Sequence, residues 1–173
     1  MVRTWLWLLA LVAAQSVADP SPISRSFQVQ AFVVNGCIFG SSGNSVSDLG
    51  TIDFGTVTNL SLGQSASSTA GNGSIVLTCT PGMTLNVGLG SGLNSVSTSE
   101  RYLKHVSGTE LLAYQLYRDA AHMTVWGTGA QALSIANFSV ATQTYVVYAR
   151  LLPRTGLPSA GEYRDTVVVE LLY

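Results

Sequence analysis

The sequence predicts an all-β fold, most simply a sandwich of the immunoglobulin type. Gly, Ser, Thr and Val are abundant, whereas Lys104 is the only lysine, a composition typical of secreted β proteins. Long windows with helical periodicity are absent, because Gly or Ser interrupts nearly every one of them. Short runs that alternate apolar and polar residues recur between clusters of turn residues. Several short strands at this spacing favour a sandwich or a barrel.

The first 18 residues predict a secretory signal peptide. Arg3 supplies a positive charge, the stretch from Trp5 to Ala14 is apolar, and Ser16-Val17-Ala18 offers small residues for cleavage. The apolar run is too short to anchor the chain in a bilayer. We therefore expect cleavage after Ala18 and a single exported domain over residues 19–173.

The charge of the exported chain excludes some classes of partner. The whole chain has eight basic and nine acidic residues, and removal of Arg3 with the leader leaves seven against nine, a net charge of −2. No run of like charge occurs. We therefore expect neither a nucleic-acid nor an acidic-lipid partner.

The first candidate strand, Ser24–Cys37, lies near the start of the exported chain. Phe27, Val29, Ala31 and Val33 alternate onto one face. An exposed hydrophobic strand at a chain end is an open pairing edge, which most proteins cover or avoid. We expect it to have a partner.

Further along the chain, five stretches alternate as strands do. They are Ser74–Cys79, Thr84–Gly90, Leu111–Asp119, Gln143–Leu152 and Asp165–Tyr173. Turn residues separate them at Pro81-Gly82, Gly127–Gly129 and Pro153–Gly161. The chain has no internal repeat, and no linker divides it further.

The two cysteines predict a disulfide between Cys37 and Cys79. Both lie in the exported part, and exported proteins meet an oxidising compartment. Two alternatives are a metal site and a free reactive thiol pair. With only His105 and His122 in addition, the chain lacks the ligand spacing of a zinc site.

Evidence for catalysis is weak. Asp119 and His122 are close in sequence, but the chain has no G-x-S-x-G nucleophile elbow and no paired carboxylates suited to acid–base work. Asp119 is more simply the end of a strand followed by a turn, where its side chain can bond to its own backbone. We expect no enzyme, no cofactor and no metal.

Two further patterns have simple interpretations. The Asn-x-Ser sequons at Asn59, Asn72 and Asn137 would carry glycans only in a eukaryotic secreted protein, and chance explains them in so Ser-rich a chain. Aromatic side chains could line a ligand groove, but on strands they more often form core or cross-strand pairs. These aromatics are Tyr114, Tyr117, Trp126, Tyr145, Tyr148 and Tyr163.

Five segments in order resemble one known family. They are Gly36-Cys37, "LGTIDFGTV" (Leu49–Val57), "GSIVLTC" (Gly73–Cys79), "LLAYQLYRDAAHMTVWGTG" (Leu111–Gly129) and "SAGEYRDTVVVELLY" (Ser159–Tyr173). Together they resemble the spore coat protein U domain family, which includes pilins of archaic, Csu-type chaperone–usher pili. The last two segments are the most specific.

The resemblance implies an incomplete immunoglobulin-like sandwich, the pilin fold, which lacks its final strand. A strand donated by the next subunit would fill the resulting hydrophobic groove. We expect the donor within residues 19–33. Its expected groove-filling residues are Ile23, Phe27, Val29, Ala31 and Val33.

The resemblance also implies partners and a location. A periplasmic chaperone would first lend a strand, an outer-membrane usher would export the subunits, and neighbouring subunits would form a cell-surface pilus for adhesion and biofilm formation. On the last strand, Val167, Val169 and Leu171 should face the core, and the Tyr173 carboxylate would meet a basic residue of the chaperone. A closed, self-contained sandwich is the alternative. Its N-terminal strand would pair in cis, and it would act as a secreted coat or carbohydrate-binding protein.

Overall fold

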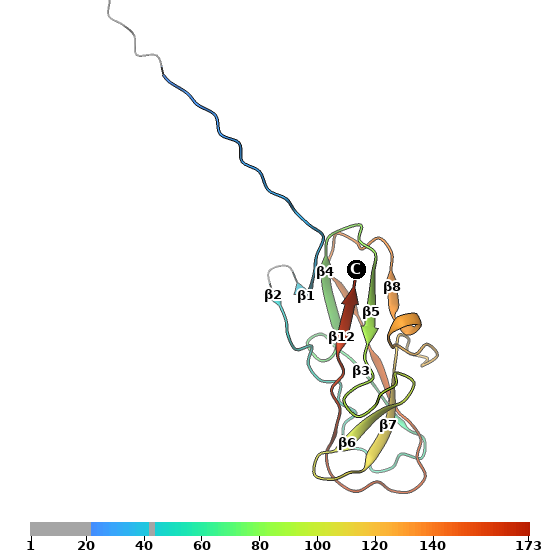
Figure 1. Ribbon diagram of the computed structural model, residues 1–173. Helices are drawn as coiled ribbons and strands as arrows, with labels where there is room; N and C mark the ends of the chain where they lie inside the picture. Colours follow the sequence, from blue (N-terminus) through green and yellow to red (C-terminus); the bar gives the residue numbers. More distant parts are fainter. Residues whose placement is uncertain (1–21, 42–43) are drawn as a thin grey trace, which may run out of the picture. The chain divides into compact units, whose positions relative to one another are not determined.

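The computed structural model describes residues 22–41 and 44–173 (Figure 1). The predicted signal peptide over residues 1–18 and the first part of the expected donor segment lie outside the described residues. The chain divides after Val33 into an N-terminal unit and a domain over residues 34–173, and each is described by itself.

The N-terminal unit corrects the first strand prediction. Residues 22–36 form no strand, and the first strand begins at Cys37, where the sequence had predicted an end. A segment becomes a strand only where a neighbouring strand supplies backbone hydrogen bonds. Alternation of apolar and polar residues does not provide that neighbour.

The domain is all-β, as predicted, and its described residues add to the strands only one 3-10 turn, η1 (Gly129–Gln131). The strands are β1 (Cys37–Ser41), β2 (Asn44–Ser45), β3 (Gln64–Ser67), β4 (Ile75–Cys79), β5 (Leu85–Leu89), β6 (Arg101–His105), β7 (Leu111–Tyr117), β8 (Leu133–Ile135), β9 (Gln143–Tyr145), β10 (Tyr148–Leu151), β11 (Tyr163–Arg164) and β12 (Val169–Leu172).

These strands form three antiparallel sheets. The sheet orders are β2-β1-β4-β9, β11-β6-β7-β10-β3 and β12-β5-β8. Inward side chains of β4, β5, β7 and β10 share one core, which makes the domain a sandwich. Trp126 lies fully within this core, where its indole N–H donates to the Val87 carbonyl at 2.9 Å.

The disulfide predicted from the sequence is present. Cys37 and Cys79 face each other in the register of β1 and β4, and their sulfurs are bonded. The bond therefore fixes the first strand of the domain to β4, at the end of β4 that leads through a short turn into β5.

Two strand predictions are wrong in extent. The stretch 143–152 is divided into β9, which pairs with β4, and β10, which pairs with β7 and β3, because the chain changes sheets at Val146-Val147. The stretch 165–173 has strand pairing only over β12. Residues 165–168 are not part of any strand.

Candidate functional site

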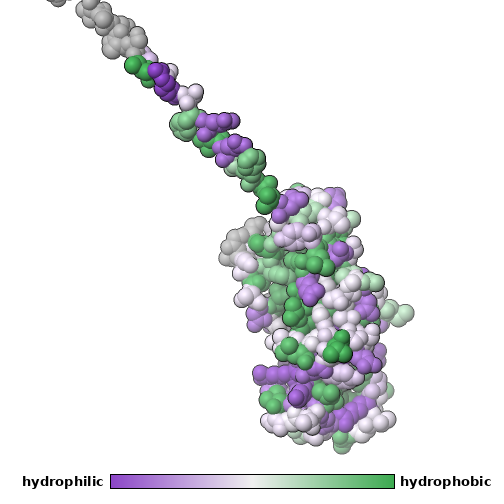
Figure 2. Space-filling view, viewed as in Figure 1, coloured by the Kyte–Doolittle hydropathy of each residue, from purple (hydrophilic) through white to green (hydrophobic). Residues whose placement is uncertain are grey.

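A groove of about 720 Å³ opens along the domain beside β12. Its floor is the apolar core itself, since Ile75, Leu89, Tyr114, Leu116 and Ala149 line it although each is almost fully buried. Apolar side chains are exposed along the face of the domain on which β12 lies (Figure 2). Such an opening over a core is unusual, because folded domains ordinarily cover their apolar interior.

The first wall of the groove is the segment 46–54. Leu49, Ile52 and Phe54 are half-buried against the core. After a turn at Asp48–Gly50, the exposed Thr51 and Asp53 alternate with Ile52 and Phe54, as side chains of a strand do. The segment is nevertheless not assigned as a strand. Between residues 50 and 57 the described part of the chain forms no backbone–backbone hydrogen bond. This wall therefore has a strand's conformation without a partner strand.

A glycine brings this wall close to β4. Gly73 has a φ of +81°, and a Cβ there would collide with the side chain of Ile52. The Gly73 N–H also donates to the Leu49 carbonyl at 2.6 Å. These contacts hold the wall in place from one side only, which leaves its other edge open.

The second wall is formed by residues 165–169, which lead into β12. Val167, Val169 and Leu171 are half-buried and pack on the core, whereas Val168 and Leu172 are exposed. β12 pairs with β5 on one edge, and within residues 22–41 and 44–173 no strand pairs with its other edge. The two walls thus present two unpaired backbone edges across one apolar groove.

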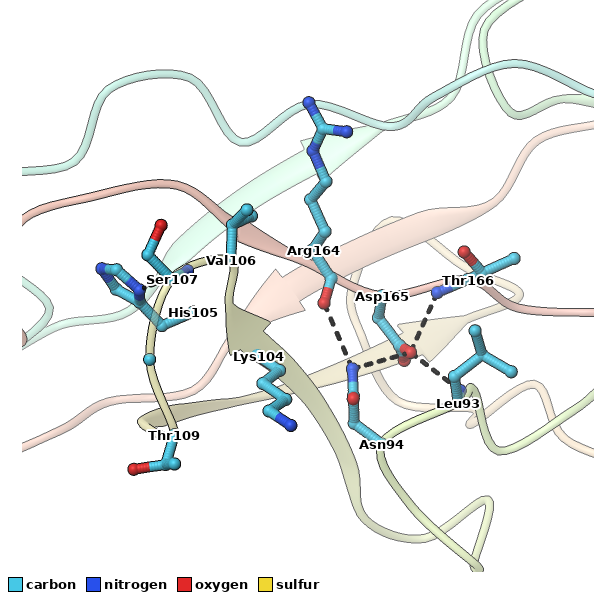
Figure 3. A pocket seen from close by; sticks show the side chains of 11 residues that line it. Leu93, Asn94, Lys104, His105, Val106, Ser107, Thr109, Arg164, Asp165 and Thr166 are labelled. Atoms are coloured by element: carbon cyan, nitrogen blue, oxygen red, sulfur yellow. Dashed lines mark hydrogen bonds between the residues drawn. The ribbon is translucent and has the colours of Figure 1, made fainter.

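Asp165 holds the second wall at its start (Figure 3). One carboxylate oxygen, Oδ1, accepts from the Leu93 N–H at 2.8 Å, the Thr166 N–H at 2.9 Å and the Asn94 amide at 3.0 Å. The other, Oδ2, accepts from the Tyr114 hydroxyl at 2.6 Å. Burial raises the pKa of Tyr114 well above its usual value, and the bond to Asp165 raises it further. The tyrosine therefore stays a neutral donor.

Beneath this wall, Arg101 is a fully buried cation without a paired carboxylate. Its guanidinium donates to the carbonyls of Gly90, Leu89 and Trp126, each at 2.9 Å, and also to the carbonyl of Thr98. It contacts the side-chain oxygen of Gln115 as well. Burial lowers its pKa. Because the guanidinium donates to all these acceptors, Arg101 links β5, β6 and β7 below the groove.

Comparison with known proteins shows the family to which this chain belongs. The model of the Spore Coat Protein U domain matches residues 23–170. The chain belongs to the spore coat protein U domain family. A curated relative, Protein U of Myxococcus xanthus, is 30% identical over 177 residues, which cover 95% of this chain and 92% of that protein.

A solved structure also resembles this spore coat protein U domain. It is a chain from the crystal structure of the CsuC–CsuE chaperone–tip adhesion subunit pre-assembly complex from archaic chaperone-usher Csu pili of Acinetobacter baumannii. The TM-score is 0.54 at 22% sequence identity, and the match covers 82% of this chain and 40% of that chain. The likeness concerns the fold, and this chain spans less than half the length of its structural neighbour.

The structure places the family's expected groove-filling residues on an exposed segment. Ile23, Phe27, Val29 and Val33 are each more than four-fifths exposed, and Ala31 is exposed as well. Their role as a donor strand stays a prediction, since a single chain offers them no groove of a second copy. Of the predicted chaperone-contacting residues, Val167 and Val169 line the groove, Leu171 packs against the core, and Tyr173 is exposed.

The weak catalytic candidates have structural roles in this spore coat protein U domain. The Asp119 carboxylate accepts from the backbone N–H groups of Met123 and Thr124, which closes the turn expected there, and the Met123 bond is the largest cause that lowers its pKa. The His122 ring packs edge-on against Tyr117. Within the described residues, no group of His, Cys, Asp and Glu has the arrangement of a metal site, and no helix is long and apolar enough to cross a membrane.

Sequence reasoning missed most of the groove. The segment 49–57 contributed to the family resemblance but was not expected to form a wall. Tyr114 was expected in the core, where it lies, but its bond to Asp165 was not foreseen. The signal that was available is the short run Thr51–Phe54, in which Ile52 and Phe54 alternate with polar residues without a predicted partner.

Proposed function

We propose that this protein is a structural subunit of an archaic chaperone–usher pilus that polymerises by donation of strands between subunits. One observation carries the proposal: an apolar groove lies between the segments 46–54 and 165–169, and within the described residues the stretches 51–54 and 165–167 on its two sides form no backbone–backbone hydrogen bond. A strand inserted there would gain backbone hydrogen bonds on both edges and would cover the core below.

The N-terminal segment has the properties of such a strand. It alternates apolar side chains on one face, and it is exposed and unpaired in the isolated chain. Inserting it into the groove of a second copy would remove apolar surface from water at about 25 cal/mol per Å² and would satisfy two open edges. Because donor and groove are different surfaces of the same chain, the contact does not close on itself and yields a fibre.

The same groove needs a temporary occupant during export. We propose that a periplasmic chaperone lends a strand there, in contact with Val167, Val169, Leu171 and Tyr173, and that an outer-membrane usher exchanges it for the next subunit. The structural neighbour comes from a chaperone–subunit complex of Csu pili, which supports this order. The fibre would then lie on the cell surface and serve adhesion and biofilm formation.

Charge placement on the two faces of the donor tests the proposal. Val29→Asp places a carboxylate on the face that enters the groove, so we expect loss of polymers and retention of the chaperone-bound subunit. Gln28→Asp and Gln30→Asp place the same charge on the opposite face and should assemble normally. Electron microscopy of surface polymers from the full-length exported chain measures both. Normal polymers after deletion of residues 19–29 would refute strand donation.

A secreted coat protein is the second candidate function. The family's description and the 30% identity with Protein U favour it. In this alternative the domain would be a self-contained sandwich, in a coat or bound to carbohydrate, with its own N-terminal segment paired in cis. Such a protein is a stable monomer when it is produced alone, whereas a pilus subunit without its chaperone aggregates or is degraded. Size-exclusion chromatography of the chain expressed alone distinguishes the two.

A further inference from the structure

The face of the N-terminal segment that carries its apolar residues also carries one charge. Strand alternation places Arg25 on the same face as Ile23, Phe27 and Val29. It is the only charged residue among the described residues of this segment, 22–33. If the segment enters a groove, Arg25 enters with it. A cation buried without a partner is strongly destabilising, so the groove must supply a carboxylate.

The charges of the groove are complementary to this arginine. Among the residues that line it, only Asp48 and Asp165 are charged, and no basic residue faces the groove. The two carboxylates belong to opposite walls. Asp48 lies between Val46, which bonds to Phe39 of β1, and Leu49, which bonds to Gly73 before β4, whereas Asp165 bonds to the loop at Leu93 beyond the end of β5. Asp48 therefore lies farther along the groove toward the disulfide end than Asp165 does.

Of these two carboxylates, Asp48 is the one with free capacity. Asp165 already accepts four hydrogen bonds, from Tyr114, Leu93, Asn94 and Thr166. Asp48 is exposed, and among the described residues it accepts one hydrogen bond, from the Gly50 N–H to Oδ1 at 2.9 Å. A carboxylate can accept a bidentate arginine as well as a backbone N–H, so Asp48 can take the guanidinium without losing its turn.

The direction in which the donor strand enters the groove also favours Asp48 as the partner of Arg25. β1 begins at the disulfide, and β12 ends at Leu172, opposite Asn86 of β5, so both lie at the same end of the domain. In a head-to-tail fibre the donor of the next copy therefore enters from the other end, where Asp165 lies. Its N-terminal part then reaches farthest along the groove. Arg25 precedes Val33 by eight residues, about 26 Å of strand, and so passes Asp165 toward Asp48.

We infer that an ion pair between Arg25 of one copy and Asp48 of the next sets the register of the donated strand. The inference rests on the proposed function. A shift of one residue would turn every apolar side chain out of the groove, and a shift of two would separate the charges. The ion pair therefore selects the register in which Phe27 and Val29 lie over the apolar floor between the two carboxylates.

Charge reversal tests the pair in the full-length exported chain. Arg25→Asp and Asp48→Arg should each reduce the yield of surface polymers by about tenfold or more, and the double variant should restore it. Asp53→Arg is the matched control. Asp53 lies on the same wall and accepts the same kind of turn bond, from the Gly55 N–H at 2.8 Å, but it does not line the groove. Single variants that assemble like Asp53→Arg, or a double variant without rescue, would overturn the ion pair.

Cysteine cross-linking measures the register directly. Arg25→Cys combined with Asp48→Cys should give disulfide-linked multimers under mild oxidation, whereas Arg25→Cys combined with Thr166→Cys, an exposed residue that lines the second wall, should not. Wild-type polymers are the reference for the proposed function, and their absence would refute strand donation itself. Polymers that cross-link at residue 166, or at neither site, would refute the register and leave strand donation standing.

Discussion

Asp165 shows how a single side chain determines the shape of the groove. Its carboxylate accepts hydrogen bonds from four donors, of which two belong to the loop at Leu93-Asn94 and one is the Tyr114 hydroxyl on β7. These bonds hold the chain in place just before residues 166–168, which have no strand partner. A carboxylate is the only side chain of this size that can accept from all four donors. We therefore regard Asp165 as the residue that positions the second wall.

Asp165→Asn tests this role. The amide keeps the size of the side chain but replaces one acceptor oxygen by a donor, so it leaves at least one partner without an acceptor. We expect the free energy of unfolding of the mature chain to fall by about 1–3 kcal/mol, measured by denaturant titration. Asp53→Asn on the first wall is the control and should change stability far less. Equal effects of the two variants would contradict a special role for Asp165.

At the scale of elements, pairing with neighbours decides what an extended segment becomes. Residues 163–172 alternate half-buried and exposed side chains throughout, yet only β11 and β12 at the two ends pair with other strands. Residues 51–54 alternate in the same way and also have no backbone partner among the described residues. β1 and β4, in contrast, are joined both by backbone pairing and by the Cys37–Cys79 bond. The domain is thus rigid beside the disulfide and open along the groove.

Removal of the disulfide should destabilise this rigid part. The bond closes a loop with a sequence separation of 42, and its loss through Cys37→Ala with Cys79→Ala should lower the free energy of unfolding by about 2–5 kcal/mol. The intact mass of the exported chain should also lie two protons below that of the reduced chain. Alkylation of both thiols without prior reduction would show that the bond is absent from the exported protein.

At the scale of the whole domain, one carboxylate connects distant parts of the chain. Glu110 accepts from the Ser159 N–H at 2.8 Å and the Tyr163 hydroxyl at 3.0 Å, and it forms an ion pair with Arg154. These bonds, those from Ser159 first, lower its pKa from 4.5 to about 2. β7, β11 and the loop between β10 and β11 therefore meet at this carboxylate.

The lowered pKa predicts a specific loss of stability in acid. A carboxylate with a depressed pKa stabilises the folded state above its unfolded pKa, and this stabilisation disappears as the pH falls through the folded value. Glu110→Gln should therefore be less stable than the wild type at neutral pH, and the difference should vanish between about pH 4.5 and 2. Thermal unfolding across this range measures it. Glu162→Gln, which removes only an exposed ion pair with Arg164, is the control. A difference independent of pH would contradict the assignment.

Local pattern alone determined half of the strands, namely β4, β5 and β7 and, with changed bounds, β9, β10 and β12. The predictions over 74–79, 84–90 and 111–119 are confirmed as β4, β5 and β7, because each is a short alternating run between turn residues and each has a buried face. The two exported cysteines were enough to predict their disulfide. The inward set Val167, Val169 and Leu171 also followed from alternation. Weaker runs, such as β3 and β8, were not predicted, since they are short and polar or lie between turns.

Only the tertiary structure decided which edges remain open. Alternation specifies which side chains face the core, but a backbone hydrogen bond joins residues that are far apart in sequence, and no local pattern contains that information. The sequence therefore indicated a strand over 24–35 and an extension of β12 over 165–167, where the described residues supply no backbone partner. The groove between 46–54 and 165–169, and the contrast between a saturated Asp165 and an available Asp48, arise from packing segments more than a hundred residues apart.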